Sequence, residues 1–369
     1  MWTNDLNEII LWLALAFCGG MFGAAIGGLC AFVLCGFGAI ISSVLMLAGQ
    51  GTLSGFVDGW VTWGPLIGPQ TAFVGGCWAA VYAKYHAGFE NGRDICKPLA
   101  GLDRRDVLLV GGAGGLCGAT MTWLFWNLPG FTVAGVAIAS NNCVAAGVAS
   151  AALIGRVLLG KSGPFGTVTK GVRRFVGSNN ACWLPWQHGK WQIMLISIGV
   201  GFPTAYLTYL NSHTHLLIFG IMCVLFLFMI LGQAVVAAHH IAICAYFATA
   251  ATGNVAWGLG FAVLAGFLCE ICAFLFTAHG DSHIDPPTVS ITVCGTLQPV
   301  LLWLGLMPFA PMQGANTSAG VTKITTAFCT GGDLRGLIFL GLVLIFAPLV
   351  VHLLRQLPAH AGDLSTSNS

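Results

Sequence analysis

Charged side chains are scarce in this sequence. Asp, Glu, Lys and Arg together make up 7% of the 369 residues, whereas soluble domains carry roughly 25%. Twelve acidic and fourteen basic side chains cannot cover the water-exposed surface of a chain of this length. The shortage excludes a water-soluble globular protein, and a net charge of +2 offers no strongly basic surface for nucleic acid.

Sequence motifs for catalysis and nucleotide binding are also missing. The chain has no HExxH, no GxSxG and no glycine-rich phosphate loop with its lysine. We therefore predict neither an enzyme nor an ATP-driven pump. The first residues, MWTNDLNE, lack the basic region of a cleavable signal peptide, so we expect the first apolar run to remain as a membrane span.

Apolar residues make up 57% of the chain, and 51 glycines would let membrane helices approach closely. A helix needs about 20 residues to cross the hydrocarbon core. Most of the fourteen cysteines lie inside apolar runs, where we predict that they pack as small apolar side chains. The sequence predicts an all-α polytopic membrane protein of about ten spans. The predicted spans are 9–29, 30–48, 67–84, 106–126, 133–155, 192–210, 215–232, 255–277, 289–306 and 336–354.

Two further apolar stretches, 50–65 and 234–253, are interrupted by glycine and polar residues. Non-helical backbone is tolerated at membrane depth only when protein surrounds it or it lines a wet cavity. We therefore expect both stretches to be broken or re-entrant segments beside a pathway. In an alternative count, 234–253 is a full span, which reverses the last three helices.

Basic residues concentrate in two loops. Residues 84–105 contain five Lys and Arg, and residues 156–190 contain six with no acid. The positive-inside rule places both loops in the cytoplasm, and Asp5 and Glu8 suit an N-terminus outside. We expect an integral protein of a plasma membrane, such as a bacterial inner membrane, whose surrounding partner is the lipid bilayer.

Short matches separated by about half the chain indicate an internal repeat. They are Gly49-Gln50 with Gly232-Gln233, Ile95-Cys96-Lys97-Pro98 with Ile284-Asp285-Pro286-Pro287, and Trp123 and Pro129 with Trp303 and Pro308. Five spans per copy make the second copy inverted, as in many transporters. The lack of Lys and Arg in 279–285 fits a loop on the side opposite 84–105. The predicted units are a first repeat 1–155, a connecting loop 156–190, a second repeat 191–355 and a disordered tail 356–369.

One short element resembles a known family. Leu128-Pro129-Gly130-Phe131-Thr132 is similar to the Leu-Pro-x-x-Thr element of urea transporters, which are also built from five-plus-five inverted repeats. The resemblance implies a helical membrane protein with a pathway for a small solute. The second half has Met307-Pro308-Phe309-Ala310-Pro311, which lacks the threonine, so the resemblance extends to the architecture and not to a urea filter.

Polar residues inside the apolar segments are the candidate pathway residues. An ionisable group at membrane depth costs about 2.5 kcal/mol or more, so such groups are usually functional or paired. Glu270 would line the pathway, couple transport to an ion gradient or anchor hydrogen bonds. Asp58 would be the other coupling candidate, or would cap a short helix or lie near the outer surface. A histidine could relay protons. The candidates are Gln50, Asp58, Asn141, Asn142, Gln233, His239, His240 and Glu270.

The alternating run His279, Asp281, His283 and Asp285 is a candidate metal site. On extended backbone the four side chains would project to one face and could bind a divalent cation through nitrogen and oxygen. An alternative is that Asp285, followed by two prolines, caps a helix. Apart from this metal, the sequence indicates no cofactor.

Together these features predict a channel or transporter for a small polar solute or ion, passive or coupled to an ion gradient. A homodimer or trimer is expected from its glycine-rich helices. Two alternatives stay open. One is a divalent-metal uptake protein with residues 279–285 as its outer capture site, and the other is a non-transporting membrane scaffold or an accessory subunit of a larger complex.

Overall fold

The computed structural model describes residues 5–177, 182–315, 327–329 and 332–359. Within these ranges the regular secondary structure is helical apart from one hairpin, in which β1 (Phe131–Val133) pairs antiparallel with β2 (Val136–Ile138). Seven helices of the described chain are long and apolar enough to cross a membrane. The prediction of an all-helical membrane protein is confirmed at this level.

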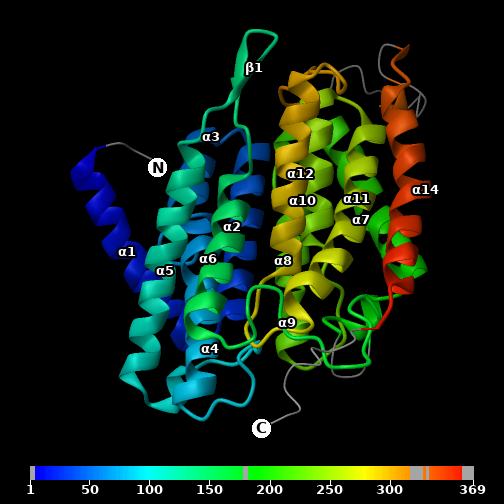
Figure 1. Ribbon diagram of the computed structural model, residues 1–369. Coiled ribbons are helices and arrows are strands. Elements are labelled where there is room, and N and C mark those ends of the chain that lie inside the picture. The colour runs from blue at the N-terminus through cyan, green and yellow to red at the C-terminus, as the bar shows by residue number, and fades with distance from the viewer. Residues whose placement is uncertain (1–4, 178–181, 316–326, 330–331, 360–369) are drawn as a thin grey trace.

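The first half consists of a group of helices around α5 (Figure 1). Its elements are α1 (Leu6–Ile26), α2 (Gly28–Leu47), α3 (Gly51–Phe56), the π-helix η1 (Val57–Thr62), the π-helix η2 (Pro69–Phe73), α4 (Val74–His86), the 3₁₀ turn η3 (Ala100–Leu102), α5 (Arg105–Trp126) and α6 (Cys143–Leu159). Helix α5 packs on α1, α4 and α6. The α1–α5 approach requires glycine, because a Cβ at Gly20 would lie 2.3 Å from the carbonyl oxygen of Gly111.

The second half is arranged in a similar way around α11. Its elements are the 3₁₀ turn η4 (Pro185–Gln187), α7 (Lys190–Leu210), the 3₁₀ turn η5 (Ser212–Thr214), α8 (Leu217–Val224), α9 (Phe226–Ile230), α10 (His239–Thr252), α11 (Val255–Cys272), the π-helix η6 (Ala273–Thr277), α12 (Pro286–Trp303) and α14 (Arg335–Gln356). Helix α11 packs on α7, α10, α12 and α14.

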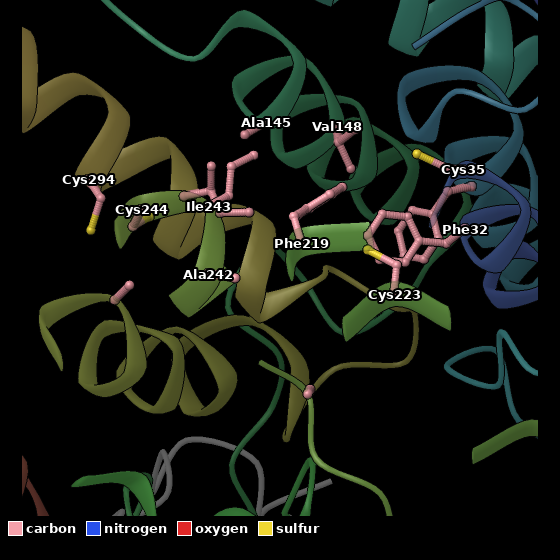
Figure 2. Packing of buried hydrophobic residues seen from close by; sticks show 14 of the residues in the cluster. Phe32, Cys35, Ala145, Val148, Phe219, Cys223, Ala242, Ile243, Cys244 and Cys294 are labelled. Atoms are coloured by element: carbon pink, nitrogen blue, oxygen red, sulfur yellow. The ribbon is translucent and has the colours of Figure 1, made fainter. Parts of the chain in front are cut away.

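The two halves meet where α2 packs on α8 and α6 packs on α12. The core between them is apolar and aromatic. Phe32 and Phe219 come from opposite halves, with ring centroids 6.2 Å apart, and Cys35 and Cys223 lie beside them (Figure 2). The cysteines of the described chain are free thiols and many are buried, so the structure agrees with their predicted packing role.

The helix bundle has two distinct ends (Figure 1). One end carries the β1–β2 hairpin and the start of α1, and we call it the hairpin end. The other end carries the loops 87–104 and 160–189, and we call it the basic end. The start of α1 and the basic loops therefore lie at opposite ends of the bundle.

One of the predicted loops lies at the other end of the bundle. Residues 239–252 form the continuous helix α10, and the loop 278–285 lies at the basic end, where Arg93 Nη1 donates to the Ala278 carbonyl oxygen at 2.8 Å and Ser162 Oγ donates to Asp281 Oδ1 at 2.7 Å. The prediction that 279–285 lies opposite 84–105 is therefore wrong, whereas 234–253 is interrupted as predicted, because residues 234–238 precede α10 without helical structure. A helix surrounded by other helices can carry polar residues, and hydropathy does not distinguish it from a broken segment.

The stretch 50–65 is interrupted, as predicted, since it contains α3, η1 and a bend. The predicted span 133–155 is only partly helical, because the hairpin precedes α6. The hairpin, which projects from one end of the bundle (Figure 1), contains Phe131 and Thr132 of the Leu-Pro-x-x-Thr element. Helix α14 ends at Gln356, and residues 360–369 of the predicted tail lie outside the described residues.

Candidate functional site

A partly open cavity of about 310 Å³ lies between the two halves at the basic end. Its walls are mainly apolar and include Leu29 and Phe32 of α2, Phe73 of η2, and Phe226 and Met229 of α9. Ligand sites typically combine such walls with a few converging polar groups, in volumes of roughly 300–1,000 Å³. The cavity therefore has the size and lining of a small-molecule site.

His239 is one of the polar groups at this cavity. It is the first residue of α10, is 2% exposed, and lies among aromatic rings, with ring centroids 4.9 Å from Phe32 and 5.5 Å from Phe226. Its Nδ1 atom is buried and has no hydrogen-bond partner in the described chain. The next residue, His240, is fully buried, and neither of its ring nitrogens has a partner there. His240 is not among the residues that line the cavity.

His283 and Asp285 also line the cavity. Asp285 caps α12, because its Oδ2 accepts from the backbone N of Thr288 at 2.9 Å and from Thr288 Oγ1 at 2.6 Å. His283 Nε2 lies 3.4 Å from the other carboxylate oxygen, Oδ1. The helix-cap interpretation of Asp285 agrees with the structure.

The other two members of the alternating run point elsewhere. Asp281 accepts hydrogen bonds from Tyr85 Oη at 2.6 Å, from Ser162 Oγ and from the backbone N of Lys161. Burial raises the pKa of Asp281, but these hydrogen bonds outweigh it and lower the pKa to about 2. The ring of His279 lies 2.9 Å from the Arg174 carbonyl oxygen. The described residues hold no group of three or more His, Cys, Asp or Glu positioned for a metal ion.

Gln50 follows α2 and Gln233 follows α9, and both are exposed. Each follows a glycine with positive φ, +77° at Gly49 and +82° at Gly232. In both turns the glutamine N–H donates to the carbonyl oxygen five residues earlier at 2.8 Å. The glycine N–H donates to the carbonyl oxygen three residues earlier at 3.0 Å. The repeated pair is therefore a helix C-cap that needs glycine, and neither glutamine lines the cavity.

Asn141, Asn142 and Glu270 also lie away from the cavity. Asn142 caps α6, and Asn141 Nδ2 donates to the Phe125 carbonyl oxygen at 3.1 Å. Glu270 Oε1 lies 2.5 Å from His188 Nδ1 and 2.8 Å from Arg355 Nη2. These contacts favour the anchoring interpretation of Glu270.

Asp58 lies toward the hairpin end, where its Oδ2 atom is 2.7 Å from His215 Nε2. The pair joins η1 to the turn before α8, and so it joins the two halves of the chain. Among the candidate pathway residues, only His239 lines the cavity directly.

Several cavity residues were not predicted from the sequence. Thr277 and Thr288 have no distinctive spacing, and Arg93 was counted only as a topological charge. Asn91 and Asp94 belong to the same loop. The loop between α4 and α5 is 18 residues long, whereas only two residues separate α10 from α11. That difference is the sequence signal that could have marked the longer loop as functional.

The fold and the cavity define a class: an all-helical membrane protein whose two halves meet around a cavity with polar groups among apolar walls. The chain belongs to a family described as Family of unknown function (DUF7973), whose model matches residues 1–173 and 167–314. No curated protein and no solved structure matches the chain.

Proposed function

We propose that the protein is a transporter or channel that moves a small polar solute or ion between its two halves, with the basic end in the cytoplasm. The observation that carries the proposal is the cavity of about 310 Å³, lined from both halves, where His239, His283 and Asp285 meet apolar walls. The two lysine- and arginine-rich loops at the same end support a cytoplasmic location.

Aromatic rings separate this cavity from the hairpin end. Phe219 lies 6.2 Å from Phe32 and 5.6 Å from Trp63, measured between ring centroids, and its ring is 5.9 Å from His239. Beyond this cluster the Asp58–His215 pair joins the halves. This arrangement supports a pathway open toward the basic end and closed toward the hairpin end, which a transporter would alternate.

The packing supports an inverted repeat with revised boundaries. Helix α5 contacts α1, α4 and α6, and α11 contacts α7, α10 and α12. Helix α1 starts at the hairpin end and α7 starts at the basic end (Figure 1). We therefore pair α1, α2, α4, α5 and α6 with α7, α8–α9, α10, α11 and α12, and α14 is an additional helix. The family-model matches overlap at 167–173, inside the loop that joins the proposed repeats.

Flux through liposomes containing the purified protein tests the proposal. Stopped-flow light scattering would follow urea, formamide, glycerol, formate and acetate, and radiotracer uptake under a proton or sodium gradient would detect coupled transport. We expect at least one solute to cross faster than in protein-free liposomes.

The variant Met229→Trp narrows the cavity and should reduce that flux at least fivefold. Leu227→Trp is the matched control, because it lies on the same short helix α9 but is exposed and does not line the cavity. No flux of any solute with folded protein, or equal flux in the two variants, would contradict the proposal.

A further inference from the structure

Helix α10 begins inside the protein without a cap. Its N-cap residue is Ala238, which has no side-chain acceptor, and residues 238–241 are all buried. Within the described chain the amide N–H groups of these four residues have no hydrogen-bond acceptor. Buried helix ends normally satisfy these groups with a side chain, with water or with a ligand.

Three other helices of the described chain begin with a side-chain cap. Asn142 caps α6, Asn254 caps α11 and Asp285 caps α12. The π-helix η2, which leads into α4, the helix that we pair with α10, begins at Pro69, which has no N–H to satisfy. The unpartnered amide groups therefore distinguish α10 from these helices.

A second, independent feature lies at the same place. The His239 side chain is 98% buried (2% exposed), lines the cavity and has an unpartnered Nδ1. Its environment is aromatic, so no described protein group supplies the missing partner. His239 thus brings the start of α10 to the wall of the cavity.

Charged groups of both signs lie around the cavity. A helix N-terminus carries about half a positive charge, and Arg93 is the only Lys or Arg among the described residues that line the cavity. Two carboxylates line it as well: Asp285 accepts hydrogen bonds from Thr288 and lies 3.4 Å from His283 Nε2, and Asp94 lies 3.6 Å from Lys97 Nζ. Neither carboxylate accepts a hydrogen bond from the amide groups at the start of α10 in the described chain.

We propose that the N-terminus of α10 and His239 form a binding site for a small monovalent anion, a short carboxylate or an oxyanion. Backbone N–H groups at a helix end suit such ligands, and the Phe32 and Phe226 rings restrict their size. The inference rests on the proposed function only for the route by which the anion enters and leaves, because binding is measured separately from flux.

Calorimetric titration of the full chain in detergent with sodium formate, acetate and nitrate tests the site. Formamide is the neutral probe, and sodium lactobionate, an anion too large for the cavity, keeps the ionic strength constant. We expect saturable binding of at least one small anion, an unfolding temperature that rises with its concentration, and no saturable binding of formamide.

The decisive variant is Ala238→Asp, which supplies the missing cap from within the chain. We expect it to weaken anion binding at least tenfold while the unfolding temperature without ligand stays equal or rises. If it does not fold, Ala238→Ser and His239→Asn replace it, with at least threefold weaker binding expected. His352→Asn, on the exposed side of α14, is the control and should bind as the wild type does.

The outcomes separate the two proposals. Anion binding without flux would leave the site standing and overturn transport. Flux of a neutral solute with no anion binding would support transport and overturn the anion site. Unchanged binding in Ala238→Asp and His239→Asn would also overturn it, because the anion would then be held elsewhere.

Discussion

Asp58 and His215 lie 157 positions apart in the sequence, yet Asp58 Oδ2 is 2.7 Å from His215 Nε2. The His215 Nδ1 atom lies 3.4 Å from Tyr246 Oη, so a short polar chain links η1 to α10. His215 has a φ of +48°, which is costly for a residue with a side chain. The contact with Asp58 helps to hold this backbone in place and joins the two halves near the hairpin end.

The variant Asp58→Asn should loosen this end of the bundle. The amide removes the negative charge that Asp58 presents to His215. Cys35 lies on α2, which packs against η1, so a looser η1 should make the Cys35 thiol easier to reach. We expect maleimide to modify Cys35 at least threefold faster from the hairpin side, measured by peptide mass spectrometry. Asp103→Asn is the control, at an exposed position near the basic end. Equal rates in both variants would show that the pair does not hold the end closed.

Glu270→Gln should reduce stability without affecting the cavity. The carboxylate contacts His188 and Arg355, and the Glu270 side chain is 11% exposed. The change therefore leaves the partly buried Arg355 guanidinium without its carboxylate partner. Allowing for the partly exposed partners, we expect a loss of about 2 kcal/mol, measured by denaturant unfolding in detergent. The exposed pair in Asp333→Asn should cost much less. Lost flux at unchanged stability would instead support a coupling role for Glu270.

Gly23→Ala should disrupt the packing of α1 on η2. A Cβ at Gly23 would lie 1.9 Å from the Ala72 carbonyl oxygen, and backbone cannot move aside as a flexible side chain can. We expect a loss of about 2–3 kcal/mol in the free energy of unfolding. Gly199→Ala on α7 meets nothing within 4 Å and should be neutral or slightly stabilising. Similar unfolding of both variants would contradict the close approach.

Gly49→Ala and Gly232→Ala should have matching effects. Both positions have positive φ and open space around them, so the cost comes from the backbone alone, about 1–2 kcal/mol each. Thermal unfolding would measure both variants. Gln50→Ala and Gln233→Ala should leave stability and flux nearly unchanged, and a large loss of flux in either would restore a pathway role for the glutamines.

Acid should weaken the loop that carries Asp281. Its pKa is lowered to about 2 in the folded protein, below the usual value of about 3.9. Its contribution to stability is therefore fully present above pH 4 and is lost as the pH falls toward 2. We expect the unfolding temperature of the wild type to fall over this range more steeply than that of Asp281→Asn. Parallel curves would show that Asp281 does not contribute.

The membrane class and many span boundaries could be predicted from the sequence, because solvation by lipid requires long uncharged runs. The path of α10 could not, since His239 and His240 are surrounded by protein and hydropathy does not register that environment. Gly49 and Gly232 form the same kind of turn, whereas the sequence indicated the neighbouring glutamines as pathway residues. A glycine with positive φ is a backbone property, and a single sequence does not report it.

The site was only partly predictable for a related reason. His239 was selected as a polar residue in an apolar stretch, and it does line the cavity. His215 and Arg93 obtain their roles from contacts with distant segments, Asp58 in one case and Ala278 in the other. Such contacts depend on how the halves pack, which neither composition nor spacing specifies.

The contrast between Pro69 and His239 has a consequence for stoichiometry. Both residues open a helix beside the same cavity, but proline gives that helix no free donor at its first position, whereas α10 retains its donors. Of the two positions that the proposed repeat makes equivalent, we expect only the start of α10 to hold an anion. We therefore expect one anion to bind per chain and not two.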